Sequence, residues 1–352
     1  MLELARDLLP LLRAGQTVAT VTVVGVARSA PRGVGSAMAV TRDARVIGSI
    51  SGGCVEGDAV AMALAALGRG DGDRARFGFT DEQAFAAGLA CGGTIDAVIS
   101  LVHPDDQTAL GALERAADDR PSALGIVTEG PATGNFVASP PTVGATGIRA
   151  SSDGAVLDVV APRRPRLVLL GAGEHAAAIC RVAAAAGFAV SVCDVWDTLV
   201  TAERFPAAAS LHTAIPEAFL TDLEARGDID AQTSICVLTH DLRLDIPALR
   251  VALASPAGFV GAMGARRTVA RREQLLREAG MPHAQIARLH SPLGLDLGGS
   301  SPDETAIAVL AEIVAVRHGG TGGALRLGTG ALHPRSSDAL APADAASCAT
   351  AR

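Results

Sequence analysis

The sequence predicts an α/β protein with a mixed α/β domain in its N-terminal half and a doubly wound parallel sheet in its C-terminal half. Strand-like and helix-like segments alternate from residue 166 to about residue 316, the pattern of a parallel sheet with helices on both faces. In the first half, β-branched runs are separated by glycine-rich turns. The predicted division is a first domain over 1–130, a connecting segment over 131–165, a second domain over 166–318 and a disordered tail over 319–352.

The elements of the first domain follow from periodicity. Leucines at helical spacing predict an amphipathic helix over residues 1–16. The further elements expected here are a strand over 18–26, a hairpin over 37–40 and 46–50, a helix from 56 to 67, a strand over 95–102, a helix over 105–118 and a strand over 122–127. In the second domain, the clearest helix begins at Ser301, an N-cap residue followed by proline and two acids.

Composition excludes several classes of protein. The net charge of −7 argues against a nucleic-acid partner, because phosphate binding needs a basic surface. The chain contains neither lysine nor tyrosine, which excludes a lysine-dependent phosphate loop, a Schiff-base enzyme and a Tyr/Lys dehydrogenase. The apolar runs are too short and interrupted for a membrane span. Acids stand where a signal peptide would have a basic n-region, and no h-region follows, so we expect a cytoplasmic protein. Six scattered cysteines without CxxC spacing predict neither a disulfide framework nor a metal site.

A glycine motif opens the second domain. Gly171-Ala172-Gly173-Glu174-His175-Ala176 follows an apolar strand and begins a helix, the arrangement of a Rossmann-like dinucleotide site. Asp194 closes the next strand, where a carboxylate would hold a ribose hydroxyl. The alternative is a Rossmann-like fold with an empty site. The negative charge of Glu174 either repels a pyrophosphate at this turn, or the side chain points outward and stabilises the helix dipole.

Polar residues also follow later strands of this domain. His240 and Asp241 stand at the carboxyl end of one strand, where ligands of open α/β sheets bind and where they could act as acid and base. The alternative is that these residues cap a helix and that the histidine forms its hydrogen bonds within the protein. Arg266 and Arg267 come after another strand, with guanidiniums suited to anions or simply to solvent.

Two loops of the first domain place a cysteine beside paired glycines. They are Ser51-Gly52-Gly53-Cys54-Val55-Glu56, which opens a helix, and Ala90-Cys91-Gly92-Gly93. A helix N-terminus favours the thiolate, the form that attacks sulfur or binds soft metals. The alternative is that each cysteine packs as a small buried hydrophobe.

These motifs, in this order, resemble the XdhC/CoxI family. The matching stretches are Ser29-Ala30-Pro31-Arg32 with Gly35-Ser36, residues 48–56, 88–93, 171–173, 203–206, 239–241 with 244–245, 261–267 and 292–298. Together they span about residues 17–316. One departure is that the family commonly has a histidine directly after Gly-Ala-Gly, where this chain has Glu174.

The resemblance implies an XdhC/CoxI domain joined to a Rossmann-like domain, in an accessory protein rather than an enzyme. Such proteins bind molybdenum cofactor (molybdopterin), protect it while it acquires its terminal sulfur, and pass it to the apo-enzyme of a molybdenum hydroxylase such as xanthine or carbon monoxide dehydrogenase. A cysteine desulfurase as sulfur source and a homodimer are compatible with this interpretation. The cofactor-binding residues predicted are Arg32, Gly52, Gly53, Cys54, Glu56, Cys91, Gly92, Gly171, Gly173, Asp194, His240 and Asp241; no catalytic residue and no metal ligand is predicted.

Two other functions remain open from the residues. One is an NAD(P)-dependent oxidoreductase, or a binder of another nucleotide, that uses the 171–176 loop with Asp194 on the ribose and His240 as acid or base. The other is a redox or metal sensor that uses the thiols of Cys54 and Cys91. The chaperone and the oxidoreductase can be distinguished by the ligand that stabilises the fold, which is molybdenum cofactor for the first and NAD(P) for the second.

Overall fold

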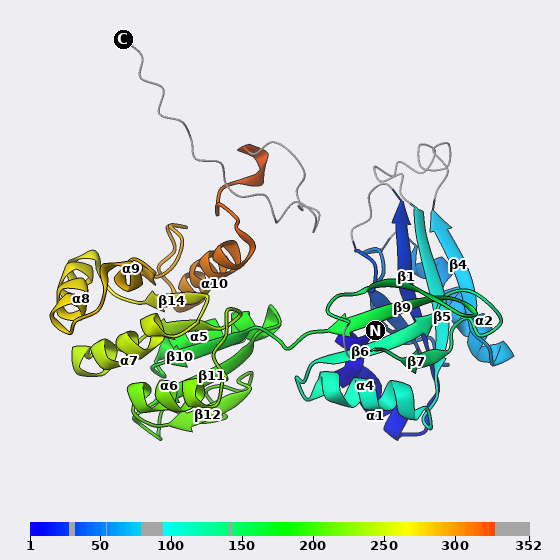
Figure 1. Cartoon of the computed structure of the whole chain (residues 1–352), viewed down its shortest axis with the longest axis horizontal. Helices are drawn as coiled ribbons and strands as arrows, with labels where there is room; N and C mark the ends of the chain where they lie inside the picture. Colours follow the sequence, from blue (N-terminus) through cyan, green and yellow to red (C-terminus); the bar gives the residue numbers. More distant parts are fainter. Residues whose placement is uncertain (28–31, 54, 79–93, 141–142, 328–352) are drawn as a thin grey trace, which may run out of the picture. The chain divides into compact units, whose positions relative to one another are not determined.

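The computed structural model describes residues 1–27, 32–53, 55–78, 94–140 and 143–327. The chain divides into two compact units, Met1–Arg163 and Arg164–Arg352 (Figure 1). Each combines sheets with helices, and each is described by itself below. Within the described residues, no helix is both long enough and apolar enough to cross a membrane.

The larger sheet of the first unit is antiparallel and has five strands. In chain order they are β1 (Val18–Ala27), β2 (Ala37–Val40), β3 (Val46–Gly48), β4 (Asp73–Gly78) and β5 (Thr94–Val102). The spatial order is β3-β2-β1-β5-β4. The predicted strand over 18–26 and the hairpin after it are therefore confirmed, with β1 at the centre of the sheet.

A second, four-stranded antiparallel sheet completes the first unit. Its strands are β6 (Ser122–Val127), β7 (Phe136–Ala138), β8 (Gly147–Ser151) and β9 (Gly154–Ala161), in the order β7-β6-β9-β8. Three of them come from residues 131–165, so this segment is part of the first unit and not a separate connection. The reason is burial, because Leu157 and Val159 of β9 share a core with Leu124 and Ile126 of β6. The Gly, Pro and Ser content that indicated a connection belongs mainly to the turns between these short strands.

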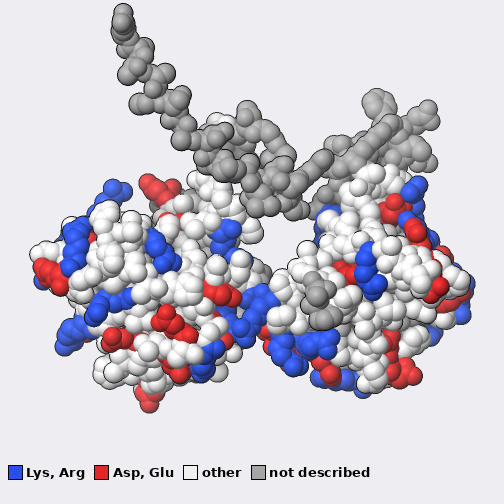
Figure 2. Space-filling model, in the orientation of Figure 1, with Lys and Arg blue, Asp and Glu red and all other residues white. Residues whose placement is uncertain are grey.

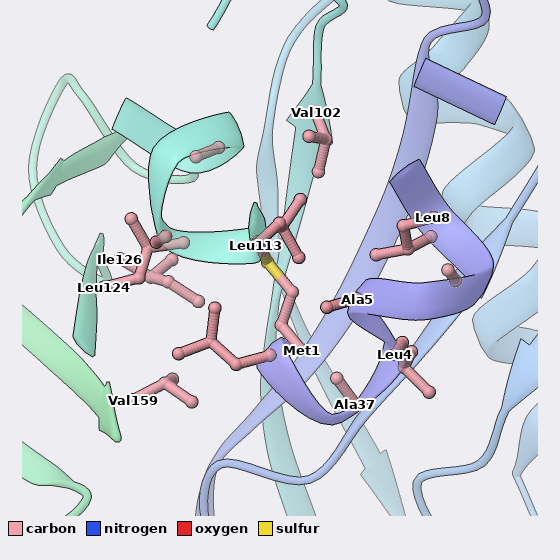
Figure 3. Packing of buried hydrophobic residues seen from close by; sticks show 14 of the residues in the cluster. Met1, Leu4, Ala5, Leu8, Ala37, Val102, Leu113, Leu124, Ile126 and Val159 are labelled. Carbon is pink, nitrogen blue, oxygen red and sulfur yellow. The ribbon is translucent and has the colours of Figure 1, made fainter. Parts of the chain in front are cut away.

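Side-chain alternation along β1 builds two cores in the first unit. Ala19, Val21 and Val23 pack with α2 (Glu56–Arg69). Val18 and Val24 belong to the opposite core, with the 3-10 turn η1 (Leu2–Leu4), α1 (Ala5–Arg13) and α4 (Gln107–Ala117). Figure 3 shows this second core, which gathers apolar side chains from the first helix, β5, α4 and the four-stranded sheet.

The second unit contains a six-stranded, all-parallel sheet. Its strands are β10 (Arg166–Leu170), β11 (Ala189–Asp194), β12 (Ser210–Thr213), β13 (Ser234–Val237), β14 (Phe259–Ala262) and β15 (Leu289–His290), in the order β12-β11-β10-β13-β14-β15. The chain begins with the central strand β10 and adds β11 and β12 on one side of it. It then crosses back and adds β13, β14 and β15 on the other side. This is the Rossmann strand order, and its topological switch point lies between β10 and β13. The predicted doubly wound parallel sheet is confirmed.

Helices cover both faces of the parallel sheet. α5 (Glu174–Ala185) and α10 (Pro302–His318) pack over the face that carries Leu167 and Leu169. The opposite face, with Val168 and Leu170, is covered by α6 (Pro216–Ala225), α7 (Leu242–Ala254), α8 (Arg266–Glu278) and α9 (His283–Ile286). The predicted cap of α10 is present as a capping box between Ser301 and Glu304. The last described element is η2 (Leu325–Leu327), and the predicted tail lies mostly outside the described residues.

Charged side chains on the visible face of each unit are mixed in sign. Figure 2 shows arginines and acidic residues interspersed among uncharged surface. Such mixing is typical of a solvated protein surface.

Candidate functional site

The glycine turn of the second unit lies at the switch point of the sheet. Gly171 follows β10 with a φ of +115°, a conformation that L side chains rarely adopt. A Cβ at this position would stand 3.0 Å from the backbone nitrogen of Thr239, which follows β13. Glycine is therefore required here, because the turn after β10 approaches the backbone after β13. The predicted site residues Gly171 and His240 are thus brought to the same edge of the sheet.

The start of α5 is open beside Gly173. Gly173 is the N-cap of this helix, no side chain caps it, and a Cβ added there would meet nothing within 4 Å. The side chain of Glu174 is 81% exposed and pairs with Arg204 at 3.7 Å. Glu174 therefore points outward, as the second alternative for this residue predicted. Its negative charge nevertheless stays in the first turn of the helix.

Asp194 holds the glycine turn from the end of β11. Its Oδ2 accepts a hydrogen bond of 2.7 Å from the backbone N–H of Ala172, and its Oδ1 accepts one of 3.1 Å from the backbone N–H of Trp196. The side chain is buried. In the described structure this carboxylate thus fixes the turn, while its contact with a ribose hydroxyl stays a prediction.

His240 and Asp241 have separate surroundings. Asp241 is the N-cap of α7 and accepts a hydrogen bond of 3.0 Å from the backbone N–H of Arg243. The Arg243 guanidinium lies 2.6 Å from the same carboxylate, and these hydrogen bonds lower the pKa of Asp241 to about 2. Asp241 thus serves as a helix cap with an ion pair. His240 instead lines a pocket of about 590 Å³.

That pocket lies at the carboxyl ends of β13 and β14, beside the start of α8. Along with His240, its polar lining consists of Asp245, Arg267, Thr268, Arg271 and Arg272. Its volume falls within the range of small-molecule sites, about 300–1,000 Å³. The sequence had indicated Arg267 as suited to anions, but it did not indicate a pocket. The i, i+4 spacing of Arg267 and Arg271 on one helix is the signal that could have revealed it.

A buried hydrogen-bond network connects this pocket to the glycine turn. The Arg272 guanidinium donates to Asp245 at 3.2 Å, to the carbonyl of Met263 at 3.0 Å and to Ser291 at 3.0 Å. The hydroxyl of Thr239 donates to the other oxygen of Asp245. Burial raises the pKa of the Asp245 carboxyl, and the hydrogen bonds from Thr239 and Arg272 only partly oppose that rise. Sequence reasoning missed Arg272, because nothing in the local pattern marks it as buried.

The first unit builds its glycine–cysteine loop around Glu56. The Oε1 of Glu56 accepts hydrogen bonds from the Ser49 hydroxyl at 2.6 Å and from the backbone N–H groups of Ser51 and Gly52 at 2.9 and 3.0 Å. Its Oε2 accepts from the Ser51 hydroxyl at 2.6 Å and from the N–H groups of Gly53 and Val55 at 2.8 and 3.2 Å. One carboxylate thus organises the backbone on both sides of residue 54.

The charge state of Glu56 follows from these contacts. Burial raises the pKa of its carboxyl, but the hydrogen bonds from Ser49, Ser51 and the loop backbone outweigh burial and hold the pKa well below its ordinary value of 4.5. Both oxygens are engaged within the loop, and so are the N–H groups of Gly52 and Gly53. Cofactor contacts of Glu56, Gly52 and Gly53 stay predictions. Cys54, Cys91 and Gly92 lie outside the described residues.

Arg32 is paired within its own unit. Its guanidinium donates to both carboxylate oxygens of Glu3, at 2.9 and 3.0 Å. Glu3 also accepts a hydrogen bond of 3.3 Å from the backbone N–H of Ala37. This arginine therefore ties the segment after β1 to η1, and its predicted contact with a cofactor stays a prediction.

Three other cysteines are core residues. Cys180, Cys193 and Cys236 are buried. Burial raises the pKa of Cys180 to about 11 and that of Cys193 to about 12. Among the described residues, no group of three or more His, Cys, Asp or Glu side chains could hold a metal ion.

Two family models match the chain. The XdhC Rossmann domain matches residues 167–313, and the XdhC and CoxI family model matches residues 11–78. A solved structure described as a xanthine dehydrogenase from Bacillus halodurans covers 90% of this chain and 95% of its own, with a TM-score of 0.69 and 20% identity. That likeness shows a shared fold.

Relatives in sequence extend over both units. The molybdenum cofactor insertion chaperone PaoD of Escherichia coli K12 is 29% identical over 306 residues, 87% of this chain and 85% of that protein. A probable xanthine dehydrogenase component of Bacillus subtilis 168 is 26% identical over 320 residues, 84% of this chain and 92% of that protein. The uncharacterized protein YqeB of Escherichia coli K12 is 38% identical over 160 residues, which make up only 29% of its own length. With the motifs in order and both family models matched in their respective units, the chain belongs to the XdhC/CoxI family.

Proposed function

We propose that this protein is a chaperone that binds molybdenum cofactor, keeps it while it acquires its terminal sulfur, and inserts it into a molybdenum hydroxylase such as xanthine or carbon monoxide dehydrogenase. The observation that carries the proposal is the alignment with a molybdenum cofactor insertion chaperone over 87% of this chain and 85% of that relative. An alignment of this extent includes both units in the same order. It therefore supports a shared task better than a single shared domain would.

In the first unit, the proposed contact with the cargo is the thiol of Cys54, joined by Cys91. The cofactor carries two dithiolene sulfurs and the metal at one end and a phosphate at the other, and a thiolate could act as a ligand of that metal. Glu56 supports this role from within the loop. Four of its six hydrogen bonds come from the backbone N–H groups of residues 51, 52, 53 and 55, and holding the residues on both sides of position 54 lowers the ordering cost of binding.

In the second unit, the proposed contacts lie along the carboxyl edge of the parallel sheet. Gly173 leaves open space at the start of α5, and His240 lines the neighbouring pocket. Both stand where ligands of open α/β sheets bind. An open helix start next to a pocket is the kind of site at which a small phosphorylated molecule could bind.

The partners follow from the same proposal. The cofactor must be transferred to the apo-enzyme of a molybdenum hydroxylase, which is the first proposed partner. A cysteine desulfurase is the proposed source of the terminal sulfur. A homodimer is the proposed assembly.

An NAD(P)-dependent oxidoreductase is the competing function, favoured by the Rossmann strand order and the GxGxxA turn. It requires Asp194 to bind a ribose. That carboxylate is buried and already accepts hydrogen bonds from Ala172 and Trp196, which makes the chaperone the better supported of the two.

The test is binding of purified molybdenum cofactor to the wild type and to Cys54→Ala and Cys91→Ala, with NAD and NADP titrated in parallel. Cys348→Ala is the matched control, because it removes a thiol outside both loops. We expect the cofactor to bind the wild type and the control, and to bind at least one loop variant more weakly while circular dichroism shows all four proteins folded. Tight binding of NAD or NADP with no binding of the cofactor would overturn the chaperone in favour of the oxidoreductase.

A further inference from the structure

We propose that the pocket beside the start of α8 binds the phosphate or pyrophosphate group of the ligand of the second unit, through Arg267 and Arg271. The identity of this ligand as molybdenum cofactor rests on the proposed function. The anion site itself rests on the pocket and its charges. It moves the phosphate away from the glycine turn, where the sequence motif had placed it.

The first argument is the charge of the pocket. Arg267 and Arg271, one helical turn apart on α8, both line it. Asp245 is the one carboxylate among the described lining residues, and it is engaged by Arg272. Neither Arg267 nor Arg271 has an ion pair with an acid in the part of the chain that the structure describes. Two guanidiniums are therefore free to bind an anion inside a concave site.

The second argument compares the two helix starts at this edge. The first turn of α5 contains Glu174, and the N–H of Ala172 just before it donates to Asp194. The first turn of α8 contains no acidic residue, and no side chain caps its N-terminus. The positive end of a helix dipole stabilises anions, and an acid in the first turn already uses that stabilisation. Local charge therefore favours a phosphate at α8 over one at α5.

The third argument is the buried arginine behind the pocket. Arg272 is 3% exposed and fixed by Asp245, Ser291 and the Met263 carbonyl. Its Nε is buried and has no hydrogen-bond acceptor among the described residues. Burying a guanidinium N–H without an acceptor is costly. Because Arg272 is already paired with Asp245, it forms a fixed wall of the pocket, and the uncompensated positive charge comes from Arg267 and Arg271.

The chemistry of these side chains selects phosphate. Guanidiniums present a planar fork of donors that matches two oxygens of a phosphate, and such charge-assisted pairs are roughly twice as strong as neutral hydrogen bonds. A pocket of about 590 Å³ accommodates the phosphate end of a molecule while the remainder extends along the sheet edge toward His240. A lone carboxylate would leave part of this positive charge uncompensated.

The experiment is isothermal titration of the full-length protein with inorganic pyrophosphate. The test variant is Arg267→Gln/Arg271→Gln, which removes two exposed side chains and should leave the fold intact. The matched control is Arg250→Gln/Arg277→Gln, which changes the net charge equally on α7 and at the far end of α8. We expect the wild type and the control to bind, and the test variant to bind about 100-fold more weakly or worse, as expected for two lost charged hydrogen bonds.

The outcomes separate this inference from the proposed function. If pyrophosphate fails to bind the wild type, or binds all three proteins equally, the anion site is wrong even if the cofactor binds elsewhere. If pyrophosphate binding depends on the arginines but molybdenum cofactor does not bind at all, the anion site stands and the chaperone fails. Competition between pyrophosphate and the cofactor for the wild type, lost in the test variant, would support both.

Discussion

The guanidinium of Arg272 lies 3.2 Å from the carboxylate of Asp245, and the two side chains are 3% and 1% exposed. They connect α8 to α7 at the edge of the parallel sheet where the glycine turn also ends. Asp245 is held in addition by Thr239, whose backbone Gly171 approaches closely. The ion pair is therefore a structural support for the whole edge.

Removing one partner of this pair should destabilise the second unit strongly. Asp245→Ala leaves Arg272 charged and buried without compensation, and we expect the free energy of unfolding to fall by about 3–5 kcal/mol. Urea unfolding followed by circular dichroism and by the fluorescence of Trp196, the single tryptophan, measures this loss. The double replacement Asp245→Leu/Arg272→Met should recover most of it, since both charges are then gone. A loss below about 1 kcal/mol for Asp245→Ala would show that water reaches the pair.

The glycine–cysteine loop should depend on the charge of Glu56. Glu56→Gln replaces one accepting oxygen by an NH₂ group that faces three donors, and we expect a loss of about 2 kcal/mol in the free energy of unfolding. Hydrogen exchange at Ser51, Gly52 and Gly53 should accelerate at the same time. Asp58→Asn, an exposed acid in the same first turn, is the control and should change stability by no more than about 0.5 kcal/mol. Equal effects of the two variants would mean that Glu56 acts only through the helix dipole.

The same carboxylate predicts a pH dependence. The pKa of Glu56 is lower in the folded protein than its ordinary value of 4.5, so below that pH the unfolded chain takes up a proton first. Its contribution to stability should be complete above pH 4.5 and decrease as the pH falls toward the folded pKa. In urea unfolding series, the stability difference between wild type and Glu56→Gln should be constant near neutrality and shrink below pH 4.5. A difference that grows on acidification would contradict the lowered pKa.

The two glycines of the turn after β10 should respond differently to alanine. Gly171→Ala places a Cβ 3.0 Å from the Thr239 nitrogen at a φ of +115°, and should cost about 1–3 kcal/mol. Gly173→Ala adds a Cβ where nothing lies within 4 Å, at an ordinary φ of −78°. Its stability should fall by no more than about 1 kcal/mol, the cost of alanine in place of a better N-cap residue. Thermal unfolding of the two variants, measured side by side, tests this difference in stability. Equal melting temperatures for the two variants would contradict the prediction.

Thiol reactivity should separate the cysteines into two groups. The chain has six, and burial raises the pKa of Cys180 to about 11, that of Cys193 to about 12, and that of the buried Cys236 as well. Since the thiolate is the reactive form, these three should react with a disulfide reagent at a pH of about 8 only after unfolding. At most the other three, Cys54, Cys91 and Cys348, should react in the native protein. Mass spectrometry of the labelled peptides identifies them, and rapid labelling of Cys193 would contradict its burial.

Much of the fold could be predicted because it depends on local patterns. A β-branched run marked β1, a short continuous apolar run marked β10, and Ser301 with its following proline and acids marked the start of α10. Residues 131–165 were misjudged, because their strands are short, and pairing with β6 gives them a core that their composition does not reveal. The family could also be identified from the sequence, since the order of its motifs survives in the chain.

The sequence by itself determined the strand–helix alternation, the glycine turn at Gly171 and the cysteine-bearing loop, because each depends on neighbours along the chain. Only the tertiary structure decided what the polar side chains do. It placed Glu56 inside its loop, Asp194 in a hydrogen bond to the glycine turn, and Arg272 in a buried pair with Asp245. The physical reason is that the role of a carboxylate or guanidinium depends on which partner the fold brings within hydrogen-bond distance. The spacing of residues along the sequence does not predict which partner that is.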